Sequence, residues 1–211
     1  MADSLSALRD RIRSAGGDDD AITVVAVTKT FGLDAVHAAH AVGLRDFGEN
    51  YAGELQTKAL AFSPPEVRWH FLGAIQTNKV GRLVQVTTCF QGLARVKEAE
   101  AIAQRRPGAA VMIQMELTGL PGRNGASQRA TPELVGRARA LDLEVWGLMT
   151  VAPPEPLAAR RAFRRLREMA DDLGVPERSM GMTDDLEIAV EEGSTMVRVG
   201  RALFGAREVR T

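Results

Sequence analysis

The chain has 211 residues, of which 45% are hydrophobic and 26% charged, a composition expected for one soluble globular domain spanning residues 1–211. Its 27 basic side chains balance its 27 acidic ones, so the net charge favours neither nucleic acid nor an anionic membrane as a partner. The single cysteine, Cys89, excludes a disulfide framework within the chain.

An amphipathic helix is expected first, over residues 4–15, and the N-terminal segment lacks the apolar core of a signal peptide. We therefore expect a cytoplasmic protein. Apolar runs of strand length then alternate with helical patterns, and none of them is long enough to span a bilayer. The predicted strands are residues 23–28, 44–47, 68–72, 85–89, 110–116, 144–148, 178–181 and 196–199. The clearest predicted helices between them are residues 33–42, 51–61, 93–105, 132–140 and 157–173.

Eight strands joined by crossover helices predict a single closed (β/α)8 TIM barrel of the α/β class, with an extra N-terminal helix. A doubly wound open sheet is the alternative. That fold would more often carry a glycine-rich dinucleotide turn after the first strand, and none follows here.

The first predicted strand is followed at once by Lys29, and Gly32 precedes the next helix. The carboxyl ends of parallel strands form the mouth of such a fold, where its chemistry lies. A lysine amine there can form a Schiff base with an aldehyde, provided that its surroundings leave part of it neutral. Considered alone, Lys29 is better explained as a surface lysine that closes a strand, and only the phosphate site and the second cation elsewhere in the chain favour the chemical role.

Glycine-marked turns follow the seventh and eighth predicted strands, at Gly181 and Gly200. In barrels these two loops and a short helix usually form a phosphate site, because free N–H groups and the helix dipole favour an anion. Thr183 adds a hydroxyl group and Arg201 a positive charge. The alternative is that both glycines only terminate strands.

Other polar residues lie within the strands or at their ends. Arg198, inside the eighth strand, must either face the barrel mouth or pair with a core carboxylate, since an unpaired buried charge is costly. Glu49 and Asn50 follow the second strand and are candidates for contact with a ligand, whereas His70 is expected to be a hydrogen-bonded core residue. His37 and His40 share a helix face without a third suitably spaced ligand, so no metal site is predicted.

Several of these residues lie in segments by which the chain resembles the pyridoxal phosphate homeostasis (YggS/PROSC) family, whose fold is a barrel like the N-terminal domain of alanine racemase. The matching segments are residues 25–30 (VAVTKT), 47–51 (FGENY), 69–79 (WHFLGAIQTNK), 147–149 (GLM), 181–185 (GMTDD) and 193–200 (GSTMVRVG). They occur in order along nearly the whole chain.

The resemblance implies that the cofactor is pyridoxal 5'-phosphate and that Lys29 is its Schiff-base lysine. It makes Arg198 the partner of the pyridine nitrogen. The further cofactor contacts that it implies are Asn50, Met149 and, around the phosphate, Met182, Thr183 and Gly200. The family usually has Ser or Thr where this chain has Arg201, which therefore replaces a hydroxyl by its charge or points outward. The loop at residues 122–125 has Arg123 where lysine is common.

Pyridoxal phosphate is the strongest electron sink when a carboxylate protonates its ring nitrogen, and an arginine there disfavours that protonation. Racemisation also needs a second acid or base opposite the lysine, which alanine racemase takes from a tyrosine of its second domain. The chain ends soon after its last predicted strand, and Tyr51 is expected to pack rather than to catalyse.

We therefore expect no robust catalysis but a monomeric protein of pyridoxal phosphate homeostasis that stores, buffers or delivers the cofactor, with pyridoxal-phosphate-dependent apo-enzymes as candidate partners. The alternatives are a weak amino-acid racemase and a barrel enzyme that forms an imine with another phosphorylated substrate.

Overall fold

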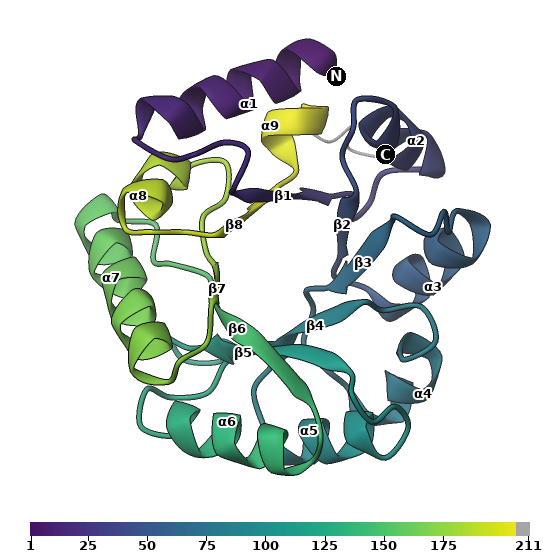
Figure 1. Ribbon diagram of the computed structural model, residues 1–211, viewed down its shortest axis with the longest axis vertical. Coiled ribbons are helices and arrows are strands. Elements are labelled where there is room, and N and C mark those ends of the chain that lie inside the picture. Colours follow the sequence, from purple (N-terminus) through teal and green to yellow (C-terminus); the bar gives the residue numbers. More distant parts are fainter. Residues whose placement is uncertain (206–211) are drawn as a thin grey trace.

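The computed structural model describes residues 1–205, in which eight parallel strands close into a barrel in sequence order (Figure 1). This confirms the predicted TIM barrel. Strand β8 pairs with β1, so that Val25 lies opposite Arg198 on one side and Asp46 on the other. The strands are β1 (Thr23–Val27), β2 (Asp46–Glu49), β3 (Arg68–Phe71), β4 (Cys89–Leu93), β5 (Ala110–Met115), β6 (Glu144–Thr150), β7 (Glu177–Ser179) and β8 (Met196–Val199).

Helices surround the barrel, and the extra N-terminal helix lies outside β1 and beside the last two helices (Figure 1). Arg11 of this helix donates hydrogen bonds to Glu187 and to the carbonyl oxygen of Thr183, which ties the N-terminal segment to the loop after β7. The helices are α1 (Ala2–Ser14), α2 (Leu33–Ala41), α3 (Ala52–Ala61), η1 (Thr77–Lys79), α4 (Val80–Leu83), α5 (Val96–Ala103), α6 (Thr131–Ala140), α7 (Pro156–Asp172), α8 (Leu186–Glu191) and α9 (Arg201–Phe204).

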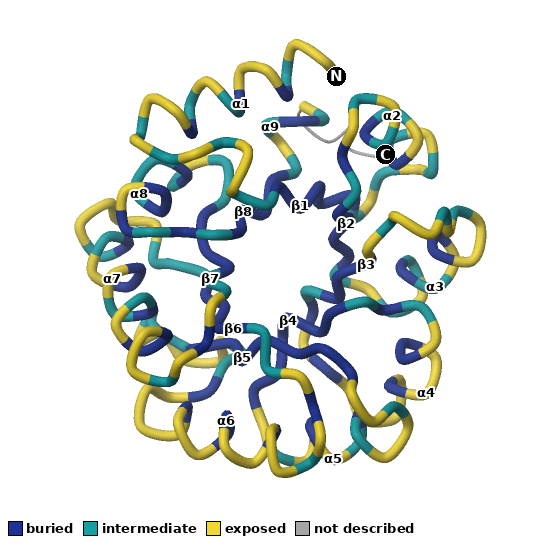
Figure 2. Tube along the Cα trace, in the orientation of Figure 1, coloured by how far each residue is buried: buried dark blue, intermediate teal, exposed yellow. Residues whose placement is uncertain are grey.

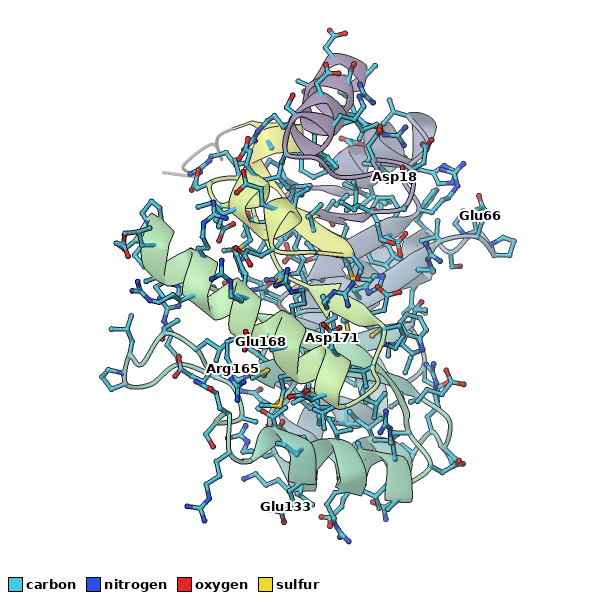
Figure 3. All side chains as sticks on the ribbon, turned by 60° about the vertical axis from the view of Figure 1, so that its left-hand side comes forward. Asp18, Glu66, Glu133, Arg165, Glu168 and Asp171 are labelled. Carbon is cyan, nitrogen blue, oxygen red and sulfur yellow. The ribbon has the colours of Figure 1, made fainter. Side chains whose placement is uncertain are left out.

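Burial follows the pattern expected of a parallel barrel that is covered by helices. The strands are buried almost throughout, whereas each helix is buried along one side only (Figure 2). Helix α7 shows the pattern: Phe163 and Leu166 are buried against the sheet, whereas Arg165 and Glu168 lie toward the outside (Figure 3). Its first turn is capped by Glu155, whose carboxylate accepts two backbone N–H groups.

Apolar side chains form two clusters. The larger lies between the strands and the helices. The smaller consists of strand residues that fill the barrel interior: Val25, Cys89, Ala110, Met112, Met149 and Met196. Within residues 1–205, none of the helices is both long and apolar enough to cross a bilayer.

The predicted position of the fourth strand, residues 85–89, was wrong by four residues. Residues 84–86 continue from α4 as a turn, and β4 begins at Cys89. The apolar run misled the prediction because the true strand carries Gln91 and Gly92, which are unusual in a buried strand. Both residues are nevertheless buried, and the Gln91 amide satisfies its hydrogen bonds inside the barrel.

Candidate functional site

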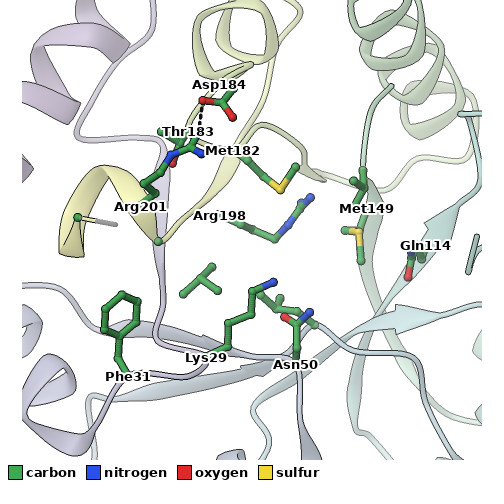
Figure 4. A pocket seen from close by; sticks show the side chains of 15 residues that line it. Lys29, Phe31, Asn50, Gln114, Met149, Met182, Thr183, Asp184, Arg198 and Arg201 are labelled. Atoms are coloured by element: carbon green, nitrogen blue, oxygen red, sulfur yellow. Dashed lines mark hydrogen bonds and ion pairs between the residues drawn. The ribbon is translucent and has the colours of Figure 1, made fainter. Parts of the chain in front are cut away.

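A cavity of about 500 Å³ opens at the carboxyl ends of the strands, in the size range typical of small-molecule sites. Lys29, Asn50 and Arg198 point into it from three different strand ends (Figure 4). All eight predicted site residues line this one cavity: Lys29, Asn50, Met149, Met182, Thr183, Arg198, Gly200 and Arg201. The structure thus brings together residues that are up to 172 positions apart in the sequence.

The backbone on both sides of Lys29 is fixed by side chains from β2 and α3. Thr28, just before it, donates its hydroxyl to Glu49 at 2.6 Å and accepts the Lys58 ammonium group at its carbonyl oxygen at 2.7 Å. Thr30, just after it, adopts a positive φ of 69° and donates its N–H to Glu54 at 2.8 Å. The position of Lys29 is therefore set by its two neighbours.

Glu49 does not line the cavity. Of the two candidates for contact with a ligand after the second strand, Glu49 and Asn50, the prediction for Glu49 was wrong. It is fully buried on the outer side of the barrel and forms an ion pair with Lys58, with 2.6 Å between the Oε1 and Nζ atoms. Burial raises the pKa of Glu49 to about 7, against the opposing effect of the hydrogen bonds from Lys58 and Thr28. Asn50, the next residue, faces the cavity instead, because successive side chains of a strand point in opposite directions.

Arg198 faces the barrel mouth, which decides between the two possibilities left by the sequence. Within residues 1–205, the hydrogen bonds of its guanidinium group all end on neutral oxygens: the Ser179 carbonyl at 2.6 Å, the Ser179 hydroxyl at 2.8 Å and the Thr150 carbonyl at 2.7 Å. Burial lowers the pKa of Arg198 to about 10, while the nearby Asp185 carboxylate acts in the opposite direction. The side chain thus remains a cation at neutral pH.

The loops after β7 and β8 meet on one side of the cavity. The N–H group of Ala202 donates to the Thr183 hydroxyl at 3.3 Å, and the Arg201 side chain forms an ion pair with Asp184 (Figure 4). At Gly200 the backbone passes so close to β1 that an added Cβ atom would lie 3.1 Å from the Val27 carbonyl oxygen. A side chain at this position would make the backbone of β1 or of the loop shift by a few tenths of an ångström.

Three further polar or aromatic residues line the cavity and were not predicted from the sequence. Gln114 exchanges hydrogen bonds with Asn124, and Phe31 packs against Phe204 with 5.1 Å between the ring centroids. Asp184 contributes through its pair with Arg201. Gln114, at the end of a predicted strand, could have been found by the same reasoning as Asn50. Nothing in the sequence marked Phe31 as a residue of the cavity.

A smaller cavity of about 200 Å³ shares Asn50 and Gln114 with the main one and is lined by Arg123. His70 is a satisfied core residue as expected, because Asp46 and Gln91 contact its two ring nitrogens. The expectation that Tyr51 packs was wrong, since 60% of this residue is exposed at the start of α3.

Comparisons with known proteins identify the family of this chain. The family model described as alanine racemase, N-terminal domain, matches residues 4–208. The pyridoxal phosphate homeostasis protein of Pseudomonas aeruginosa is 39% identical over 212 residues, which cover 95% of this chain and 91% of that protein. The protein of the same name from Escherichia coli K12 is 33% identical, with 99% of this chain and 97% of that protein covered.

Two solved structures have the same fold as this chain. PipY of Synechococcus elongatus with pyridoxal phosphate bound superimposes with a TM-score of 0.81 at 27% identity, over 94% of this chain and all of that one. Alanine racemase of Corynebacterium glutamicum shares the fold, with a TM-score of 0.72 at 17% identity over 98% of this chain and 61% of that one. The matches at 39% and 33% identity over nearly the full length carry the conclusion that the chain belongs to the family of pyridoxal phosphate homeostasis proteins, built on the alanine racemase N-terminal domain.

Proposed function

We propose that this protein binds pyridoxal 5'-phosphate, holds it as a Schiff base on Lys29, and serves to store, buffer or deliver it. The observation that carries the proposal is the placement of a lysine and a buried arginine in one cavity, with Gly200 and Thr183 along one side. The binding of this cofactor by the related PipY supports the assignment.

The cavity fits the chemistry of each part of the cofactor. An amine suits an aldehyde, a guanidinium group suits a pyridine nitrogen that accepts a hydrogen bond, and a glycine-lined backbone suits a phosphate. In this proposal Lys29 reacts with the aldehyde, Arg198 contacts the ring nitrogen, and Asn50 and Met149 flank the ring. Met182, Thr183 and Gly200 contact the phosphate.

Lys29 carries the covalent step. Its neutral amine adds to the aldehyde carbon and the carbonyl oxygen leaves as water, so that a C=N bond joins the chain to the cofactor. Water hydrolyses the same C=N bond, which releases the aldehyde and restores the lysine amine without any other reactant. A carrier that must give up its cargo to apo-enzymes needs this reversibility.

Arg198 supports a carrier rather than an efficient enzyme. When bound, pyridoxal phosphate supplies an electron sink for carbanion chemistry, and that sink is strongest when its ring nitrogen is protonated. A guanidinium group with a pKa near 10 donates to the nitrogen without giving up its proton at neutral pH. We therefore propose weak or no amino-acid turnover. We also propose that the protein acts as a monomer in the cytoplasm.

The test is a visible absorbance titration of the purified protein with pyridoxal phosphate, followed by borohydride reduction and peptide mapping. We expect an imine band and reduced cofactor on Lys29, both absent from Lys29→Ala. Reduced cofactor on Lys79 or Lys97, or no band at all, would contradict the proposal. An enantiomer-conversion assay on the same samples tests the carrier role, since a lysine-dependent kcat of about 1–1000 s⁻¹ would favour the racemase instead.

A further inference from the structure

A chain of hydrogen bonds runs from Arg198 through the barrel interior to β2. The Ser179 hydroxyl accepts from Arg198 at 2.8 Å and donates to the Gln91 side-chain oxygen at 2.7 Å. The Gln91 amide nitrogen lies 2.9 Å from Nδ1 of His70, and Nε2 of His70 lies 2.8 Å from Asp46. Five strands contribute one residue each: β8, β7, β4, β3 and β2.

Each link of this chain has a fixed direction. A guanidinium group only donates, so the single hydroxyl hydrogen of Ser179 is left for the Gln91 oxygen. The amide nitrogen of Gln91 also only donates, which makes Nδ1 of His70 an acceptor and leaves its hydrogen on Nε2. That hydrogen points to the Asp46 carboxylate. The chain therefore runs one way, from a cation at the cavity to an anion in the barrel.

The members of the chain are almost completely enclosed. His70, Gln91 and Ser179 are fully buried, and Asp46 and Arg198 are each 5% exposed. Burial alone would raise the pKa of Asp46, but the hydrogen bonds from His70 and from Arg68 hold it below its usual value. In an enclosed polar network, breaking one link leaves its neighbours unsatisfied and free to reorient.

The charges facing the chain are few. At its far end Arg68 of β3 makes two hydrogen bonds to Asp46, and that arginine is half exposed. At the cavity end Arg198 has the neutral oxygens of Ser179 and Thr150 as its hydrogen-bond partners within residues 1–205. The Arg198 guanidinium group is thus oriented by this chain of hydrogen bonds and by two carbonyl groups, and no carboxylate within residues 1–205 makes a hydrogen bond to it.

We propose that Ser179, Gln91 and His70 are positioning residues, which orient the Arg198 guanidinium toward the ring nitrogen of a bound pyridine aldehyde. This inference rests on the proposed function. It adds that recognition of the nitrogen is set by three residues that do not touch the ligand, and that the hydrogen bonds behind it extend through the interior as far as Asp46 of β2.

The test compares pyridoxal phosphate with its deaza analogue, in which a carbon atom replaces the ring nitrogen. Both have the same aldehyde and phosphate, so the ratio of their dissociation constants isolates the contact with the nitrogen. A hydrogen bond to a charged group predicts that the wild type prefers pyridoxal phosphate by roughly 10- to 100-fold. Gln91→Leu breaks the chain at its centre and should reduce this ratio at least fivefold.

Cys89→Ala is the matched control, because Cys89 is buried in the same strand and fills the barrel interior without belonging to the chain. It should lower the melting temperature and leave the ratio unchanged. His70→Gln keeps one acceptor and one donor and should retain most of the preference, whereas His70→Leu should lose it. Ser179→Ala provides a second break in the chain should Gln91→Leu not fold.

The outcomes separate this inference from the function on which it rests. If the wild type forms no imine band with either aldehyde, the proposed function fails. If the wild type forms the band and Gln91→Leu and Ser179→Ala keep the wild-type ratio, the cofactor assignment stands and the positioning role is overturned. An equal loss of the ratio in Cys89→Ala would also overturn it, because any disturbance of the interior would then suffice.

Discussion

The ammonium group of Lys58 lies 2.7 Å from the carbonyl oxygen of Thr28, so this buried lysine fixes the backbone immediately before Lys29, whose own side chain is partly exposed. The same ammonium group pairs with Glu49 and lies 3.6 Å from Glu54, which in turn accepts the N–H group of Thr30. Helix α3 therefore controls where the first strand ends and where the Lys29 side chain begins.

Replacing Lys58 with Met should destabilise the fold and weaken cofactor attachment. The substitution leaves Glu49 as a buried carboxylate without its cation, and breaking such a pair costs about 3–5 kcal/mol. Urea unfolding should show this loss, and the imine band should form more slowly because the segment 28–30 is no longer fixed. Lys97→Met, at an exposed position of α5, serves as the control and should change neither. Unchanged stability of Lys58→Met would mean that the ion pair is dispensable.

Glu49 predicts an unusual pH dependence of stability. Burial raises its pKa to about 7 in the folded protein from an ordinary value near 4.5. Between these values the folded state binds the proton more tightly than the unfolded state, so the contribution is present below pH 4.5 and is lost as the pH rises to 7. The slope from this group is at most about 1.4 kcal/mol per pH unit. Unfolding free energies measured from pH 5 to 8 should fall less steeply in Glu49→Gln than in the wild type, and equal slopes would contradict the assignment.

Gly200→Val should weaken phosphate recognition in particular. Its Cβ atom would meet the Val27 carbonyl oxygen at 3.1 Å, and the two methyl groups would force the loop after β8 away from its position. The dissociation constant of pyridoxal phosphate should rise roughly 10- to 100-fold, the value of one or two charge-assisted hydrogen bonds, while that of pyridoxal changes little. Gly136→Val on α6, where an added Cβ atom meets nothing within 4 Å, is the control. Equal losses for both aldehydes would show that the phosphate lies elsewhere.

Arg201→Ser should alter the affinity for pyridoxal phosphate by less than about threefold. The Arg201 side chain is 58% exposed and pairs with Asp184, which is 80% exposed, and pairs of this kind contribute about 0–1 kcal/mol. The serine also restores the hydroxyl group that is usual in the family. A large loss of affinity in the titration would mean that this chain recognises the phosphate through the arginine.

The sequence predicted those parts of the molecule that depend on local pattern. Lys29 could be assigned to the barrel mouth because parallel strands bring their carboxyl ends together there. The pattern around Arg198 left two possibilities open, and only the family resemblance assigned it to the cofactor. The fourth strand was misplaced because Gln91 interrupts its apolar run, and that residue makes sense only as a member of a network contributed by five strands. Lys58 was missed for a similar reason, since an isolated helical pattern does not tell which lysine faces buried carboxylates.

The pairing of β1 with β8 has a consequence for folding of the chain during synthesis. Lys29 lies in the first seventh of the chain and Arg198 in its last tenth, and Val25 and Arg198 become neighbours only when the ring of strands closes. A chain still on the ribosome before residue 196 has neither a closed sheet nor a place for the aldehyde. Contacts between such distant segments are formed late and slowly. The ability to retain the cofactor would therefore report that the chain has been synthesised through β8 and that the barrel has closed.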